Sequence, residues 1–160
     1  MGLNQGSGEA NPTTYDWTVR VQGLGEKESR VYVGNHAFSV GKQASFSREE
    51  GQVTSVEYLL GALGGDLVMG FQRQAAKKGA VIDSVECVVT GRLDNPLVFL
   101  GVIGASGRPG FGFVRATLYV SSGSEKEALL QIWQDTLATS PLVDTLKRSA
   151  TVSLDLKVSG

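Results

Sequence analysis

Apolar and polar residues alternate with a period of two, which is typical of half-buried β-strands, in several parts of the chain. The first such run covers residues 15–22, and two more short runs flank Gly34 and Asn35. A Gly-Asn pair between short β runs indicates a two-residue hairpin turn. The pattern therefore predicts a three-stranded meander near the N-terminus. Later strands are predicted over residues 84–92, 115–121 and 151–158.

A long helix is predicted after the meander. Thr54 and Glu57 match a capping box, in which a hydroxyl three residues before a carboxylate marks a helix start. Lys77, Lys78 and Gly79 suit its end, because lysines complement the helix dipole and glycine provides a left-handed stop. Each glycine inside a helix costs about 1 kcal/mol relative to alanine. Four glycines in this helix therefore predict a closely crossing second helix: Gly61, Gly64, Gly65 and Gly70.

Two shorter helices are predicted near the C-terminus. Ser124 and Glu127 match a second capping box, which would open a helix ending at Ala138. Ser140 and Pro141 have the pattern of an N-cap followed by the first residue of a short helix. Runs of antiparallel strands with helices on one side describe an α+β fold.

A glycine-rich stretch over residues 100–113 separates two of the predicted strands. Its spacing fits neither a Walker loop nor a dinucleotide fingerprint, and a strand-like run follows it in place of a helix. A bent loop or an edge strand is the favoured interpretation.

Asp66 is the one residue in the apolar run 59–71 that packing does not explain. A helix that is apolar all round has no solvent face, so we expect protein to enclose it. A carboxylate there needs a cationic or hydrogen-bonding partner, or it must be protonated. Asp66 is therefore either a working acid or base or the relic of an earlier site.

Composition narrows the possible functions. The 160 residues carry a formal net charge of −1 with the two signs mixed, so we expect no nucleic-acid partner. The single cysteine, Cys87, excludes an intrachain disulfide and a cysteine-rich zinc site. The one histidine, His36, is expected to be structural. We therefore predict that the protein binds no metal and no cofactor. No apolar run is long enough to span a membrane. We expect a cytoplasmic protein with a flexible leader, residues 1–13, and one α+β domain, residues 14–160.

The segment Ser55-Val-Glu-Tyr-Leu-Leu-Gly-Ala-Leu-Gly-Gly-Asp66 resembles the central helix of the OsmC/Ohr family, the osmotic-stress and organic-hydroperoxide-resistance proteins, which typically reads Pro-x-Glu-Leu-Leu-Leu-Ala-Ala-Leu-Gly-Gly-Cys. Ser140-Pro-Leu-Val-Asp-Thr-Leu146 is similar to the family's Cys-Pro-Val-x-x-Thr-Leu. The resemblance covers about residues 15–158. It implies an intertwined homodimer with two long central helices, six-stranded sheets and sites at the subunit interface.

The two cysteines of the family's peroxidases fall at Asp66 and Ser140 in this chain. In those peroxidases the first cysteine reacts with peroxide and the second resolves it. Peroxide reduction needs a thiolate that becomes a sulfenic acid and is then trapped by a second thiol. Oxygen side chains perform neither step, so the resemblance implies a member without thiol peroxidase activity. Cys87 lies on an apolar strand face without an adjacent basic residue, which favours a structural role.

Glu57 matches the family motif's glutamate, which in peroxidase members pairs with an arginine near the first cysteine. Arg20 and Arg30 both lie in the right region, and Arg30 is slightly favoured because it follows the loop after the first strand. We predict that an arginine pairs with Asp66 as well.

Three functions remain open. The favoured one is a homodimer that binds a small molecule in an interfacial pocket lined by Glu57, Asp66, Ser140 and Arg30. In the second, Glu57 and Asp66, with Ser140, carry out non-redox acid–base chemistry; the third is an inactive structural dimer. A hydrolase with Ser140 as nucleophile is disfavoured, because there is one histidine and no Gly-x-Ser-x-Gly elbow.

Overall fold

The computed structural model describes residues 14–41 and 51–160. The chain divides into two compact units, residues 1–55 and 56–160. The predicted leader, residues 1–13, lies outside the described residues. The single domain that was predicted over 14–160 stays a prediction, and each unit is considered by itself below.

The first unit contains the predicted three-stranded meander. Its strands are β1 (Arg20–Gly23), β2 (Glu28–Val33) and β3 (His36–Gly41), in the order β1-β2-β3 with both pairs antiparallel. Gly34 adopts a positive φ of 55° in the turn between β2 and β3, as the Gly-Asn pair suggested. β1 begins five residues later than the alternation predicted, and His36 is exposed at the start of β3.

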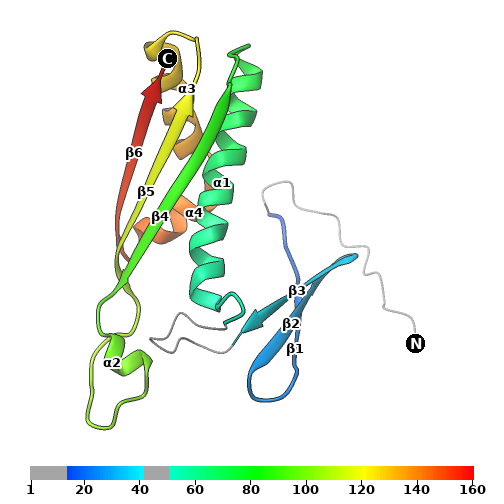
Figure 1. The fold of residues 1–160 in the computed structure, drawn as a ribbon, viewed down its shortest axis with the longest axis vertical. Coiled ribbons are helices and arrows are strands. Elements are labelled where there is room, and N and C mark those ends of the chain that lie inside the picture. Colours follow the sequence, from blue (N-terminus) through cyan, green and yellow to red (C-terminus); the bar gives the residue numbers. More distant parts are fainter. Residues whose placement is uncertain (1–13, 42–50) are drawn as a thin grey trace. The chain divides into compact units, whose positions relative to one another are not determined.

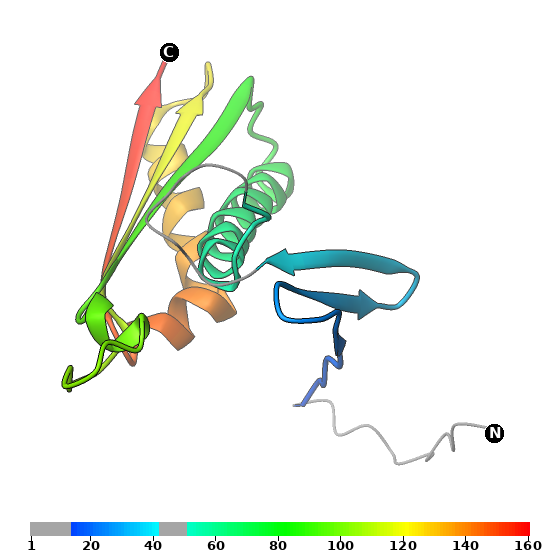
Figure 2. The ribbon, with the colours of Figure 1, turned by 60° about the horizontal axis from the view of Figure 1, so that its bottom comes forward.

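The second unit contains one sheet with helices on one of its faces (Figures 1 and 2). The sheet has the order β4-β5-β6. The elements of this unit are α1 (Ser55–Lys77), β4 (Ser84–Leu93), α2 (Pro96–Phe99), β5 (Phe111–Ser121), α3 (Lys126–Ala138), α4 (Pro141–Lys147) and β6 (Thr151–Ser159). Helix α1 precedes the sheet, and α3 and α4 connect β5 to β6. The α+β class predicted from the sequence is confirmed.

One pair of strands differs from the predicted antiparallel arrangement. β4 and β5 are antiparallel, but β5 and β6 are parallel. The reason is the connection: a tight turn joins antiparallel neighbours, whereas α3 and α4 carry the chain back to the end of the sheet where β5 began. Alternation along a strand reports which side chains are buried but not which way the strand runs.

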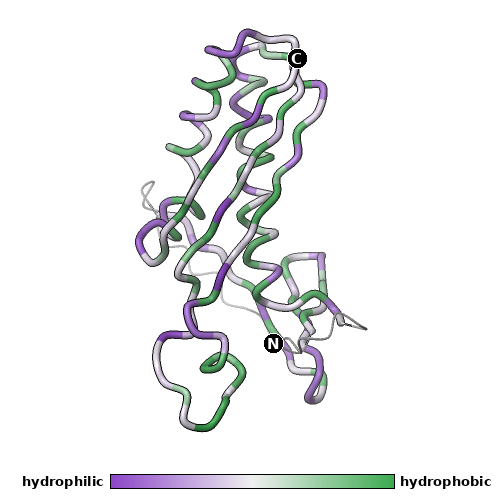
Figure 3. Tube along the Cα trace, turned by 60° about the vertical axis from the view of Figure 1, so that its left-hand side comes forward, coloured by the Kyte–Doolittle hydropathy of each residue, from purple (hydrophilic) through white to green (hydrophobic). Residues whose placement is uncertain are grey.

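The core lies between the sheet and its helices. Hydrophobic and hydrophilic residues alternate along the three strands (Figure 3), and the apolar set of β5, which includes Val114, Ala116 and Leu118, is buried. The side chains of Leu67 and Phe71 on α1 meet this set with no exposed surface. Burial of this kind contributes roughly 1.5–3 kcal/mol for each large side chain. The core therefore fixes the rotation of α1 about its axis.

Helix ends follow the sequence signals with two exceptions. α1 stops at Lys77, and Gly79 has the predicted left-handed φ of 69°. The capping box at Ser124 was wrong: α3 starts at Lys126 with Glu125 as N-cap, and no side chain caps it. The sequence interpretation also missed α2, although Asn95 accepts hydrogen bonds from two of its backbone N–H groups.

The glycines of α1 serve different purposes. A Cβ at Gly70 would lie 3.1 Å from Thr136 of α3, which is the predicted close helix crossing. A Cβ at Gly64 would lie 3.2 Å from Val89 of β4, so this glycine is needed against the sheet. Gly61 and Gly65 have nothing within 4 Å of such a Cβ.

This contrast predicts different effects of two neighbouring substitutions. Gly65→Ala should stabilise the protein by about 0.5–1 kcal/mol, because alanine has the higher helix propensity and meets open space. Gly64→Ala gains the same propensity but must displace Val89, so it should be less stable than Gly65→Ala by about 1 kcal/mol or more. Urea unfolding of the two variants measures the difference, and equal free energies of unfolding would contradict the close packing at Gly64.

Candidate functional site

Asp66 and Ser140 form a hydrogen bond with each other. Asp66 lies in the middle of α1, and Ser140 is the N-cap of α4, 74 residues further along the chain. The Ser140 hydroxyl donates to Oδ2 of Asp66 and accepts from the backbone N–H of Val143 at 3.0 Å. Ser140 is buried and Asp66 is half-buried. The hydroxyl therefore has both of its hydrogen-bonding roles filled within the protein.

The environment of Asp66 differs in part from the sequence expectation. The need for a polar partner is met, and the partner is a hydroxyl on α4. The predicted enclosure of α1 by protein on most sides does not hold within one chain, because Leu63, Leu67 and Phe71 define one buried side and leave Asp66 partly open. Arg30 lies on β2 in the first unit, and its pairing with Asp66 or Glu57 stays a prediction, as does the choice between Arg30 and Arg20.

Glu57 lies on a different side of α1 from Asp66. The two residues are nine positions apart, which is about 2.5 helical turns, so their side chains leave the helix in nearly opposite directions. Asp66 points to α4, whereas Glu57 lines a pocket between α1 and β4. The structure thus brings Asp66 and Ser140 together and places Glu57 elsewhere.

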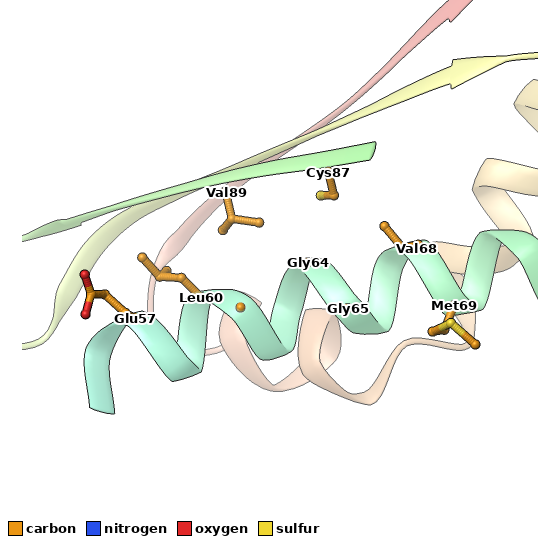
Figure 4. Close-up of a pocket in the computed structure, with 9 residues that line it drawn as sticks. Glu57, Leu60, Gly64, Gly65, Val68, Met69, Cys87 and Val89 are labelled. Carbon is orange, nitrogen blue, oxygen red and sulfur yellow. The ribbon is translucent and has the colours of Figure 1, made fainter. Parts of the chain in front are cut away.

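The pocket has a volume of about 580 Å³. Figure 4 shows Cys87 and Val89 of β4 on one side of it, facing Gly64 of α1, with Glu57 toward the start of the helix. The absence of side chains at the glycines of α1 leaves the space open. Apart from Glu57 and the Cys87 thiol, the lining is apolar or glycine: Leu60, Gly61, Gly64, Gly65, Val68, Met69 and Val89.

Cys87 is placed as the sequence predicted, on the core side of β4, but it also lines the pocket. Burial raises the pKa of its thiol above the ordinary value. The lining residues that belong to the described part of the chain include no cation that would stabilise a thiolate. Cys87 is therefore held as a thiol, which is the less reactive form.

A dependence of stability on pH follows from the raised pKa of Cys87. A group whose folded pKa lies above its unfolded value, about 8.5 for cysteine, stabilises the fold below that pH and loses the effect as pH rises through the folded pKa. Wild type should therefore lose stability relative to Cys87→Ala as the pH rises above about 8.5. Urea unfolding of both proteins at a series of pH values measures this, and parallel stability curves would contradict it.

The pocket could have been found in part from the sequence. Glu57, Gly61, Gly64 and Val68 recur at the spacing of three or four residues that defines one side of a helix. The partner strand could not be identified in that way, because the alternation of β4 does not show which side of α1 it covers.

Metal binding and membrane spanning were assessed for the described residues. Residues 14–41 and 51–160 contain no grouping of three or more His, Cys, Asp or Glu side chains that could hold a metal ion. None of the described helices combines the length and the hydropathy required to cross a membrane.

Comparisons with known proteins bear on the family. The sequence model of the family described as OsmC-like protein matches residues 48–155. A search of the curated proteins gave no match.

Several solved structures share the fold. An OsmC-like protein from Mycoplasma pneumoniae is 12% identical with a TM-score of 0.74, covering 91% of this chain and 99% of that chain. An organic hydroperoxide resistance protein OsmC from Legionella pneumophila is 12% identical with a TM-score of 0.64, covering 90% and 98%. The organic hydroperoxide resistance protein OhrB of Bacillus subtilis is 15% identical with a TM-score of 0.58, covering 88% and 98%. The predicted OsmC/Ohr-like fold is thereby confirmed, and identities this low support the fold alone.

Proposed function

Since the chain belongs to the OsmC-like protein family, we propose that it is a member that binds a small, largely apolar molecule in the pocket between α1 and β4 and does not reduce peroxides through thiols. The observation that carries this proposal is the hydrogen bond between Asp66 and Ser140. These are the two positions at which the family resemblance expects a reactive and a resolving cysteine. Here they hold a carboxylate and a hydroxyl that satisfy each other.

The remaining thiol supports the same conclusion. Cys87 is the one cysteine of the chain, so a resolving thiol would have to come from another molecule. Its raised pKa reduces the thiolate that attack on a peroxide requires. A single cysteine with a raised pKa therefore does not favour peroxide reduction by a reactive and a resolving cysteine.

The pocket indicates the class of ligand. Ligand sites are commonly concave and mostly apolar with a few polar groups that fix orientation. This pocket offers an apolar surface with the Glu57 carboxylate toward one end. The ligand should therefore be largely apolar, with one polar group that lies near Glu57.

A homodimer is part of the proposal. Helix α1 exposes 40% of Leu59 and 65% of Met69 on sides that the core does not cover. A second subunit would cover such a surface, and interfaces of obligate dimers typically bury above about 2,000 Å². Light scattering should give twice the chain mass of 16.9 kDa. A folded protein with the mass of one chain would contradict the dimer.

The acid–base alternative has less support. General acid–base catalysis needs its groups within reach of one substrate. Glu57 and Asp66 leave opposite sides of α1, and Asp66 is engaged with Ser140. A shared active site for the two carboxylates would require one of these side chains to leave its present surroundings.

Binding can be tested with the neutral apolar dye Nile red, whose fluorescence rises in an apolar site. Gly61→Leu should abolish the increase, because the new side chain enters the pocket. Ala62→Leu is the matched control: Ala62 is exposed and next in sequence, but it does not line the pocket. Bound dye should also slow the alkylation of Cys87 by iodoacetamide. Equal dye binding by both variants, or no protection of Cys87, would contradict the proposed site.

A further inference from the structure

The face of the β4-β5-β6 sheet that the helices leave open (Figures 1 and 2) carries an unusual group of side chains at one end. The strand register places them in two adjacent rows of three. Across β4, β5 and β6, one row is Thr90, Arg115 and Ser153, and the next is Arg92, Phe113 and Thr151. We call these six residues the arginine cluster. It contains two guanidiniums, three hydroxyls, one aromatic ring and no carboxylate.

The two arginines gather around one ring. The guanidinium carbon of Arg92 lies 5.4 Å from the centroid of the Phe113 ring, and that of Arg115 lies 5.5 Å from it. Both arginines are exposed, and Phe113 is half-buried. The cation–π contacts therefore hold two positive charges close together at the surface, where they would otherwise repel.

The two arginines of this cluster form no salt bridge with an acidic side chain among the described residues. The salt bridges of the described residues join Lys78 to Asp135 and Arg148 to Asp144. Neither Arg92 nor Arg115 takes part in one.

Two acids border the cluster. Asp94 follows Arg92 by two residues, and its carboxylate lies over Gly112, where a Cβ would collide with it. Asp155 lies in the row next to Thr90, Arg115 and Ser153 and accepts a hydrogen bond of 3.4 Å from Ser153. Glu86 and Lys157 lie one row further away.

The chemistry of the cluster matches a phosphate joined to a planar ring. A guanidinium presents a rigid fork of donors that suits phosphate oxygens, and hydroxyls donate to the same acceptors. Guanidinium planes and aromatic rings also stack on nucleic-acid bases. Strands lie about 4.8 Å apart, so three strands give a surface about 10 Å wide, enough for one phosphate and one base.

We propose that the arginine cluster binds a mononucleotide, with the phosphate held between Arg92 and Arg115 and the base stacked against the Phe113 side of the cluster. This site lies on the opposite face of the sheet from Cys87 and Val89, which face α1. It does not depend on the proposed pocket, and either site can fail without the other.

The test is an NMR titration of the ¹⁵N-labelled full-length protein with adenosine 5′-monophosphate. Inorganic phosphate, adenosine and a single-stranded oligonucleotide serve as separate arms. The backbone amides of residues 90–92, 113–115 and 151–153 should shift in a saturable way, with a dissociation constant on the order of 1 mM or tighter. Arg92→Gln and Arg115→Gln should each weaken binding at least about fivefold, which is about 1 kcal/mol.

Two further variants separate the contribution of the cluster's arginines from that of general charge and from that of the Phe113 ring. Arg73→Gln removes an exposed arginine of α1 with the same change of net charge, and it should alter affinity less than about twofold. Phe113→Leu keeps an apolar side chain but removes the ring, so it should weaken the monophosphate and leave inorganic phosphate unchanged. Nile red fluorescence should be the same in all four variants.

Each other outcome overturns a stated part of the proposal. The absence of saturable shifts, or equal losses in Arg73→Gln and Arg115→Gln, would refute the site. Equal affinity for inorganic phosphate and the mononucleotide would refute the role of the base. An oligonucleotide that binds far more tightly than the mononucleotide would replace the small ligand with a nucleic acid.

Discussion

The double variant Asp66→Cys/Ser140→Cys should form one intramolecular disulfide when it is treated with cumene hydroperoxide, and it should consume the peroxide when dithiothreitol is supplied. The two side chains already meet between α1 and the start of α4. A thiolate at one position would attack the peroxide oxygen, releasing the alcohol and leaving a sulfenic acid. The second thiol would then displace water and close the disulfide, and the reductant would reopen it.

The experiment is best done in a Cys87→Ala background, so that the new cysteines are the only thiols. Each single variant, with either Asp66 or Ser140 retained, should consume peroxide far more slowly because no internal thiol resolves the sulfenic acid. Loss of two free thiols per chain, measured under denaturing conditions, reports the disulfide. A double variant that keeps both thiols free after oxidation would show that the two positions are too far apart for the bond, whose Cβ atoms must lie within about 4.5 Å.

Ser140→Ala should destabilise the protein by about 2.5–4 kcal/mol. The Ser140 hydroxyl caps α4 by accepting from the Val143 N–H, and loss of an N-cap costs about 1 kcal/mol. It also donates to the half-buried Asp66 carboxylate, and a hydrogen bond to a charged group contributes roughly 1.5–3 kcal/mol. The two losses combine in one substitution because a single oxygen has both roles.

Two companion variants make this prediction specific. Thr145→Ala removes another hydroxyl of α4, which is exposed and bonds to the Pro141 carbonyl, and it should cost less than about 0.5 kcal/mol. Asp66→Ala and the double variant complete a thermodynamic cycle with Ser140→Ala. The coupling free energy should be at least about 1 kcal/mol. Additive effects of Asp66→Ala and Ser140→Ala on the free energy of unfolding would mean that the hydrogen bond contributes nothing.

Local signals along the chain predicted most of the fold. The alternation in residues 151–158 and the Ser140–Pro141 cap gave elements that the structure contains almost unchanged. The same logic applied to Asn95 and Pro96 would have found α2, since an N-cap side chain followed by proline is the signature that identified α4. The capping box at Ser124 failed because a local match does not guarantee that the side chain reaches the helix backbone.

Nonlocal features were harder to predict. The parallel pairing of β5 with β6 depends on the path of α3 and α4, which strand alternation does not report. The hydrogen bond from Ser140, 74 residues away in sequence, to Asp66 was not predicted from local signals. The expected pairing of Asp66 with an arginine stays a prediction. The separation of Glu57 from Asp66, in contrast, follows from helical periodicity alone.

We propose that in this OsmC-like protein a hydrogen bond between Asp66 and Ser140 occupies the positions of a reactive thiol pair, and that the protein has no thiol peroxidase activity. The most direct measurement is the rate of cumene hydroperoxide consumption by the wild-type protein in the presence of dithiothreitol, compared with Cys87→Ala and with buffer. All three rates should be equal. A wild-type rate above buffer that disappears in Cys87→Ala would contradict the claim and would make Cys87 the reactive thiol.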